Sequence, residues 1–286
     1  MMALYGEHTL RGERIREARA NATKTYFGPD IGEFAFSVMM AAVWRKLAEA
    51  CEHVIVCSRP DRKYLYQDFC HEFIGHTLDC HGDCVTARPC PPAKDIEKWI
   101  PQGIQVVRPK DYGDKLWPGK YIVYGEINHQ WDGAIVVHAR NRPYCEWRNW
   151  PVEYWHRLGR WLGRNYPQRR VVCIGTKTHA IAIERALDMR GADLGSQATI
   201  LRTAGATGGF AFGPSSGPLH FATHCRCPVG PVWCGGDPGE MERTSRWYRE
   251  TWNPHKVRAA TYLRGDWTPP YEDVEMWLEQ FITERS

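Results

Sequence analysis

The order of strands, glycine-containing turns and helices along the chain constrains its fold most. A short apolar segment at 24–28 leads through a loop with two glycines into an apolar helix expected over 35–50. A continuous apolar run follows at 53–58, as in strands that are buried on both faces of a parallel sheet. A second series of this kind begins at 134–138. The alternation predicts an α/β fold with two Rossmann-like parallel-sheet lobes that divide near residues 128–132.

Further segments extend both series. In the first half, short strands are also expected at 105–107 and 121–124. In the second half, the strands after the first are expected over 170–174, 208–212 and, as the last one, 228–232. Helices are expected from Pro151, over 180–190, from residue 217 and over 268–285, with one more short element over 199–204.

Length and composition exclude some classes of protein. A chain of 286 residues is long enough for two lobes of about 130 residues each. A net charge of +4 permits a polyanionic partner, but it is smaller than the positive charge expected of a dedicated nucleic-acid-binding domain. No apolar run approaches the length of a membrane span, and the N-terminus lacks the apolar core of a signal peptide. We therefore expect a protein of the bacterial or phage-infected cytoplasm, with its 11 cysteines reduced.

One stretch is dense in residues that can bind metals. Its members are Cys70, His71, His76, Cys80, His81, Cys84 and Cys90. Cys80 and Cys84 have a tolerable spacing for zinc, but no second regular pair follows them. The stretch is either a zinc site or a set of reduced thiols and surface histidines, and the prediction for the protein is no bound metal.

The segment 213–227, GPSSGPLHFATHCRC, carries the clearest chemical signal. A strand end delivers small residues into the start of a helix, where unpaired N–H groups and the positive end of the helix dipole favour an anion. Ser215, Ser216 and Gly217 offer hydroxyl donors and close backbone approach, which suits a diphosphate. The alternative is an ordinary capped helix, because Ser and Pro are common at helix starts.

This segment resembles the donor-binding motif of glycosyltransferase family 9, the ADP-heptose:lipopolysaccharide heptosyltransferases. That family typically shows G-N-D-S-G-P-x-H-x-A-A followed by a strand with T-P-V. The positions that match in place are Gly213, Ser216, Gly217, Pro218, His220, Ala222, Pro228 and Val229. The Asn-Asp pair of the family is Pro214-Ser215 here. The resemblance implies that Ser215, Ser216, Gly217, Pro218 and His220 hold the diphosphate of a nucleotide-sugar donor.

Two further segments resemble the same family. Residues 136–140 and 148–155 are similar to its strand-H-P-G sequence followed by K/R-x-W-P-x-E-x-[WF], which implies that His138 and Arg140 face the donor. Arg148 and Trp150 are then expected to border the site on the acceptor side. Residues 170–175 resemble the V-V-L-L-G strand that follows. Gly175, Thr176 and Lys177 are assigned to the donor site, because they lie at the carboxyl end of that strand.

Near the N-terminus, Ile31-Gly32-Glu33 stands where the family has L-G-D. The resemblance implies that Glu33 is the catalytic base that deprotonates the acceptor hydroxyl, with Asp30 as its nearby competitor on the acceptor side. The alternative is that Glu33 caps or charges the first turn of its helix, where the dipole favours a carboxylate.

Together, these features imply a GT-B glycosyltransferase with an interdomain cleft. Residues 1–130 would form the acceptor-binding lobe, 131–267 the nucleotide-sugar-binding lobe, and 268–286 a helix that packs back toward the N-terminal lobe. The expected reaction is inverting transfer of a sugar to a hydroxyl, without a metal or other cofactor, because a helix dipole and basic side chains can serve the diphosphate.

The sequence leaves two classes of acceptor open, and also a role without catalysis. We expect a 5-hydroxymethylpyrimidine in DNA, because the chain is basic and rich in Arg and Trp, and because residues 28–68 also resemble phage-encoded glycosyltransferases. The alternatives are a lipopolysaccharide or capsule glycan and a non-catalytic nucleotide- or sugar-binding module. A basic aromatic segment over 243–255 either contacts the acceptor or forms a solvated helix face with an aromatic seam.

Overall fold

The structure, a computed structural model, describes residues 24–78, 97–107, 118–143, 145–263 and 266–284. The chain divides into two compact units, Met1–Tyr121 and Ile122–Ser286. This division precedes the break that the sequence suggested between residues 130 and 131. Each unit contains a parallel sheet among its described residues, as the alternation of strands and helices predicted.

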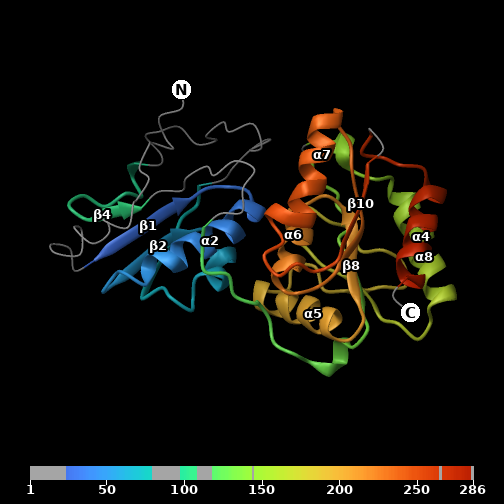
Figure 1. The fold of residues 1–286 in the computed structure, drawn as a ribbon, viewed down its shortest axis with the longest axis horizontal. Coiled ribbons are helices and arrows are strands. Elements are labelled where there is room, and N and C mark those ends of the chain that lie inside the picture. The colour runs from blue at the N-terminus through green and yellow to red at the C-terminus, as the bar shows by residue number, and fades with distance from the viewer. Residues whose placement is uncertain (1–23, 79–96, 108–117, 144, 264–265, 285–286) are drawn as a thin grey trace. The chain divides into compact units, whose positions relative to one another are not determined.

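The described residues of the first unit contain a four-stranded sheet in the order β3-β2-β1-β4 (Figure 1). Its strands are β1 (Thr25–Asp30), β2 (Val54–Ser58), β3 (Glu72–Gly75) and β4 (Gln105–Val107). Helix α2 (Phe34–Ala48) connects β1 to β2, and a 3₁₀-helix η1 (Pro60–Leu65) follows β2. β1 and β2 are buried throughout, which explains the continuous apolar run that identified β2.

The second unit is a six-stranded sheet in the order β10-β9-β8-β5-β6-β7. Its strands are β5 (Ile135–Val137), β6 (Val171–Cys173), β7 (Leu187–Asp188), β8 (Phe210–Pro214), β9 (Val229–Cys234) and β10 (Ala259–Leu263). The connecting helices are α4 (Val152–Asn165), α5 (Leu194–Ala206), α6 (Gly217–His224) and α7 (Pro238–Arg246), and α8 (Tyr271–Thr283) ends the chain. Short 3₁₀-helices lie at His129–Trp131 (η3) and Glu146–Arg148 (η4), and α7 continues into a π-helix, η5 (Trp247–Thr251).

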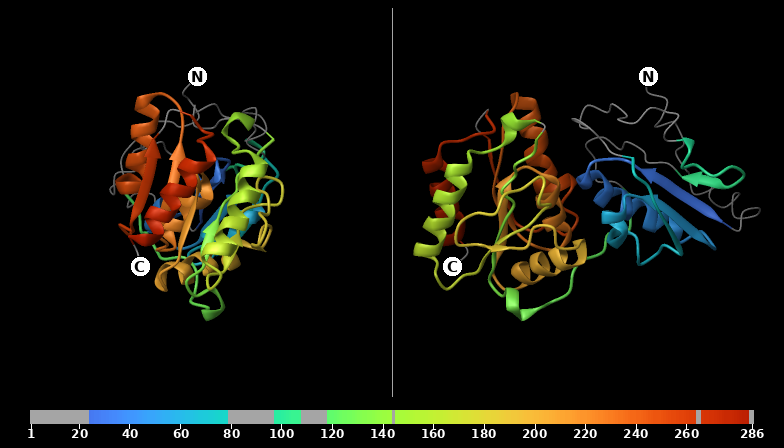
Figure 2. Two further views of the ribbon diagram at one scale, coloured as in Figure 1. Left: turned by 90° about the vertical axis from the view of Figure 1, so that its right-hand side faces the viewer. Right: turned by 180° about the vertical axis from the view of Figure 1, so that it is seen from behind.

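Helices cover both faces of this sheet. α4 and α8 lie together on one face, while α5 and α6 lie on the other (Figures 1 and 2). The α4–α8 face contains the main hydrophobic core, in which Trp155, Phe212 and Trp277 are buried. This layered arrangement leaves the carboxyl ends of the strands for the loops that carry the candidate site.

Three expectations from the sequence are wrong. Residues 180–190 do not form a helix, because Ala180 bridges to Arg140, Arg185 has a left-handed backbone (φ 63°), and Leu187–Asp188 joins the sheet as β7. Residues 121–124 are not a strand. The strand near 228–232 is not the last one, because β10 follows it at the sheet edge.

The C-terminal helix α8 buries Val274, Leu278 and Phe281 in the core of the second unit. Its packing toward the N-terminal lobe stays a prediction from the sequence. The apolar face of α8 packs against β9 and the aromatic residues around Trp150, so that face is buried within its own unit. No helix in the described ranges has both the length and the apolarity needed to cross a membrane.

Candidate functional site

The carboxyl ends of β5, β6 and β8 bring most of the predicted donor residues together. Val137 pairs in register with Cys173 of β6 and with Phe212 of β8, so the three strands end side by side. His138 follows β5, and its N–H donates to the Phe212 carbonyl at 3.1 Å. Ligands of parallel α/β sheets bind at this edge.

Ser216 is the best-defined residue at this edge. It is the N-cap of α6, yet its side chain makes no capping hydrogen bond. Its hydroxyl instead lies 2.9 Å from Nδ1 of His138, and its N–H donates to the phenolic oxygen of Tyr248 at 3.1 Å. The interpretation of an ordinary capped helix therefore does not explain this serine.

The backbone of the turn offers few amides to a ligand. The Ser215 N–H donates to the Trp233 carbonyl at 2.8 Å, the Ser216 N–H is taken by Tyr248, and Pro218 has no N–H. The remaining amide of the turn, that of Gly217, has no hydrogen-bond partner among the described residues. An anion at this turn would therefore depend on side chains as much as on the backbone.

Two glycines at this edge lie too close to His138 to carry a side chain. Gly213 has φ 144°, and a Cβ at this position would lie 2.7 Å from the His138 carbonyl oxygen. Gly175 has φ 113°, and a Cβ there would lie 3.0 Å from Cδ2 of His138. Both glycines let the ends of β6 and β8 approach His138 closely.

Positive charge collects at this edge of the sheet. Arg148 donates from Nη2 to the Ser215 carbonyl at 3.3 Å, and its guanidinium lies 3.8 Å from the centre of the Trp267 ring. Burial, together with the nearby Arg140, Arg142 and His179, lowers the pKa of His138 to about 3. None of the charged groups that shift this pKa is acidic. The surroundings therefore favour a bound anion.

The Ser216–His138 pair is not arranged for nucleophilic catalysis. A histidine with a pKa of about 3 stays neutral and is a poor proton acceptor near neutral pH. In Ser–His catalysis a carboxylate supports the imidazole, whereas Arg140 and Arg142 occupy the surroundings here. The pair thus serves to orient the Ser216 hydroxyl.

Several buried side-chain nitrogens around the turn have no hydrogen-bond partner in the part of the chain that the structure describes. Among them are Nε of Arg148 and Nδ1 of His220. His220 is 4% exposed, and burial lowers its pKa to about 3. Its ring stacks on Tyr248 with 4.1 Å between ring centres. Unsatisfied buried polar groups cost free energy, but such atoms also occur in the first unit, as Nε1 of Trp44 does, so they do not by themselves mark a ligand site.

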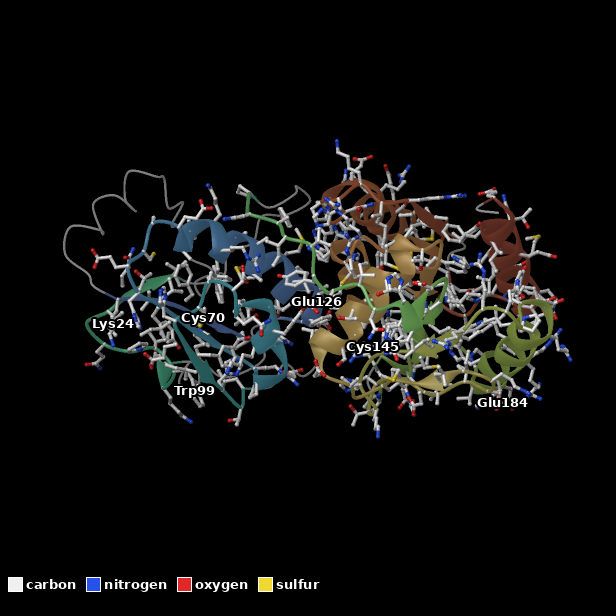
Figure 3. The ribbon with its side chains drawn as sticks, turned by 90° about the horizontal axis from the view of Figure 1, so that it is seen from below. Lys24, Cys70, Trp99, Glu126, Cys145 and Glu184 are labelled. Carbon is white, nitrogen blue, oxygen red and sulfur yellow. The ribbon has the colours of Figure 1, made fainter. Side chains whose placement is uncertain are left out.

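The other predicted donor residues have different surroundings. Arg140 donates to the Cys145 carbonyl and to Oδ1 of Asn149, so it orders the loop in which Cys145 lies (Figure 3). Thr176 and Lys177 are exposed on the loop after β6, beyond the buried Gly175. Pro218 occupies the first turn of α6.

Trp150 does not border the site as expected. It is 1% exposed, its indole N–H donates to the Pro269 carbonyl at 2.7 Å, and its ring packs against Trp155 and Tyr271. The indole therefore belongs to the core beneath α8, and its neighbour Arg148 is the residue of this motif that reaches the Ser215 turn.

Sequence reasoning missed the role of Tyr248. The residue was noted only as part of the basic aromatic segment. Its contact with Ser216 depends on the π-helix η5, in which Trp252 donates its N–H to the Trp247 carbonyl. A single extra residue in a helical turn leaves no recognisable pattern in a single sequence.

In the first unit, Asp30 is the centre of a buried network. Its carboxylate accepts hydrogen bonds from Tyr66 (2.7 Å), Ser58 (3.0 Å) and the Gly32 N–H (3.3 Å), and Arg62 lies 3.4 Å away. Burial opposes ionisation, but Arg62 and these hydrogen bonds outweigh it and lower the pKa of Asp30. Asp30 is 2% exposed, so its carboxylate holds the loop together and is poorly suited to the expected acceptor contact.

Glu33 follows this loop and precedes α2. Its backbone is extended, at φ −63° and ψ 157°, and its side chain makes no capping hydrogen bond. Arg62 donates to the Gly32 carbonyl at 2.6 Å, which fixes the backbone immediately before Glu33. Glu33 therefore does not cap the helix through its side chain, and the favourable charge of a carboxylate at the start of a helix stays the alternative to a catalytic role.

The cysteine- and histidine-rich stretch is only partly described. Cys80, His81, Cys84 and Cys90 lie outside the described residues. Cys70, labelled in Figure 3, donates to the Glu72 carbonyl, and His76 binds the Asp30 carbonyl oxygen at 2.7 Å. Within the described ranges, no three metal-ligating side chains come together.

No protein-family model matches the sequence, and no curated protein matches it significantly. Solved structures with the same architecture include the crystal structure of the glycosyl transferase family 9 from Veillonella parvula DSM 2008. Its TM-score is 0.59 at 12% sequence identity, over 92% of this chain and 98% of that one. Another is E. coli ADP-heptose lps heptosyltransferase II, with a TM-score of 0.54 at 11% identity, over 92% of this chain and 99% of that one. At these identities the likeness establishes the fold: the chain has the GT-B fold of the glycosyltransferase family 9 structures.

Proposed function

We propose that the protein is an inverting glycosyltransferase that transfers a sugar from a nucleotide diphosphate to a hydroxyl of a lipopolysaccharide-type glycan. The turn around Ser216 carries this proposal. It combines an oriented hydroxyl, the available Gly217 amide and the Arg148 guanidinium at the carboxyl edge of a parallel sheet. These are groups that stabilise the negative charge of a leaving diphosphate.

The proposed reaction is a direct displacement. The acceptor oxygen forms a bond to the anomeric carbon while the bond from that carbon to the diphosphate oxygen breaks. The acceptor proton passes to the Glu33 carboxylate, and the diphosphate leaves with the bonding electrons. Arg148 and Ser216 provide the stabilisation of the leaving group, so we propose that no metal ion takes part.

The proposed donor and acceptor follow from the comparison. One structure with this fold is an ADP-heptose lps heptosyltransferase, which favours an ADP-sugar and a lipopolysaccharide glycan. The DNA acceptor expected from the basic, aromatic sequence finds no support among the structures that share the fold. A DNA acceptor and a non-catalytic binding module are therefore the competing outcomes of the test.

The test is a transfer assay with the full-length protein. ADP-heptose, UDP-glucose and GDP-mannose are each offered with heptose-deficient lipopolysaccharide and with duplex DNA that contains 5-hydroxymethylcytosine. Mass spectrometry of both acceptors then identifies any added sugar. Addition to the glycan alone supports the proposal, and addition to the DNA base alone replaces the glycan with DNA. Donor binding without any transfer would favour a binding module.

A further inference from the structure

Tyr248 contacts the backbone of the Ser216 turn from a segment 32 residues away in the sequence. Its phenolic oxygen accepts the Ser216 N–H at 3.1 Å, and the phenol donates to the Ser216 carbonyl oxygen at 3.3 Å. The side chain is fully buried, and its ring is nearly parallel to that of His220, at 14°. The phenol is therefore fixed at the start of α6.

The π-helix η5 holds Tyr248 through contacts other than the Ser216 bonds. The Trp252 N–H donates to the Trp247 carbonyl at 2.8 Å, and the Trp252 carbonyl accepts from the Thr223 hydroxyl of α6 at 2.9 Å. Asn253, which is buried, donates to the Tyr248 carbonyl at 2.9 Å. Such π-turns are frequent at functional sites. The position of the phenol is thus set by the fold before a ligand binds.

The phenol decides which groups of the turn remain available. Of the amides at Ser216 and Gly217, it occupies the first and leaves the second. We propose that Tyr248 is a positioning residue for the donor diphosphate: it withholds the Ser216 amide and holds the turn so that the Gly217 amide and the Ser216 hydroxyl meet the phosphate. This inference rests on the proposed function, since it concerns the same nucleotide-diphosphate site.

The substitution Tyr248→Phe removes only the phenolic oxygen. The Ser216 amide then loses its partner, and the turn gains freedom that a bound anion must remove. The phenol makes two hydrogen bonds to the Ser216 backbone, and a cost of about 1 kcal/mol for ordering the turn without them corresponds to about fivefold weaker binding. The contact orients the donor alike in the ground state and in the transition state. The donor KM should therefore rise about fivefold while kcat stays nearly constant.

Inorganic pyrophosphate is the probe, measured by isothermal titration calorimetry on the full-length protein. Tyr166→Phe is the matched control, because Tyr166 follows α4 and precedes β6, at the opposite edge of the sheet. We expect about fivefold weaker pyrophosphate binding for Tyr248→Phe and unchanged binding for Tyr166→Phe, with both variants folded. Unchanged or tighter binding by folded Tyr248→Phe would overturn the assignment.

A second measurement does not depend on a variant that folds. In the ¹⁵N-labelled native protein, pyrophosphate should shift the Gly217 amide resonance strongly and the Ser216 amide little. The reverse pattern would show that the Ser216 amide leaves Tyr248 for the ligand, and it would overturn the positioning role while the proposed function stands. If the native protein binds neither pyrophosphate nor any nucleotide sugar, the proposed function and this inference fail together.

Discussion

At the scale of single residues, Arg148 is the basic side chain in contact with the Ser215 carbonyl. Its guanidinium is planar and held over the Trp267 ring, so it is oriented before a phosphate arrives. We predict that Arg148→Met weakens binding of ADP about 10- to 100-fold, because a hydrogen bond to a charged group contributes about 1.5–3 kcal/mol. Calorimetric titration of ADP checks this.

Two further variants sharpen the Arg148 prediction. Arg148→Lys keeps the charge but loses the planar group that stacks on Trp267, so its affinity should fall between those of the native protein and Arg148→Met. Arg164→Met is the control, because Arg164 is an exposed arginine in the last turn of α4. Equal ADP affinities for Arg148→Met and Arg164→Met would show that Arg148 does not bind the phosphates.

His220 makes stability depend on pH. Its pKa is about 3 in the folded protein, because burial disfavours the charged ring, and about 6.5 in an unfolded chain. As pH falls from about 6.5 toward 3, only the unfolded state takes up a proton at this site, so stability declines by about 1.4 kcal/mol per pH unit. His220→Phe should keep the stack on Tyr248 and reduce that slope by about this amount.

Denaturant unfolding between pH 7 and pH 4.5, followed by tryptophan fluorescence, measures the slope. At pH 7 His220 is neutral in both states, so a difference in stability there reflects packing, and only the change in slope below pH 6.5 reports the proton. An unchanged slope in His220→Phe would mean that the ring is already protonated in the folded protein or reaches solvent.

The residues also show what a sequence motif can and cannot identify. The motif resemblance singled out Ser216 and Arg148, because small residues after a strand and a basic residue before a helix leave local patterns, and the structure brings Arg148 to the Ser215 turn although it was predicted on the acceptor side. The resemblance misplaced Trp150, because a motif does not say toward which layer a side chain points. Tyr248 could not be identified, since its contact with Ser216 requires both the π-helix and the return of the chain to the sheet edge.

At the scale of elements, the same limit explains the errors in the fold. β2 and α2 were predictable, because their apolar patterns are continuous or helical over their whole length. Residues 180–190 have a helix-forming composition, but tertiary contacts override it. Arg190 donates to the Ala180 carbonyl and to Asp188, and these bonds keep the segment extended so that β7 can pair with β6.

The loop between β1 and α2 offers a prediction at this scale. Arg62 is 5% exposed and donates to the Gly32 carbonyl as well as facing Asp30. Arg62→Met should destabilise the first unit by about 3–5 kcal/mol, because it leaves the buried Asp30 carboxylate without its cation. Adding Asp30→Asn should restore part of this loss. Chemical denaturation of the three proteins checks the prediction, and an unchanged midpoint for Arg62→Met would contradict it.

At the scale of the whole molecule, each unit carries a different part of the proposed reaction. Glu33 belongs to the first unit, whereas Ser216, Arg148 and Tyr248 belong to the second. The C-terminal helix α8 contributes to the core of the second unit, with Phe281 packed against Phe210. The second unit therefore contains a closed hydrophobic core and the entire candidate diphosphate site.

This distribution predicts that residues 122–286 fold alone and bind ADP but transfer no sugar. Their core includes aromatic residues from α4, β8, β9 and α8, which lie within this segment of the chain. We expect cooperative thermal unfolding and an ADP affinity within about threefold of that of the full-length protein, since half a kcal/mol is the ordinary error of such comparisons. Calorimetry of the isolated segment, with the full-length Glu33→Gln variant beside it, makes the test.

The Glu33→Gln variant should bind ADP normally and lack transfer, as the isolated segment does. Loss of ADP binding in a folded segment would show that the first unit contributes to the donor site, and full transfer by Glu33→Gln would remove Glu33 as the base.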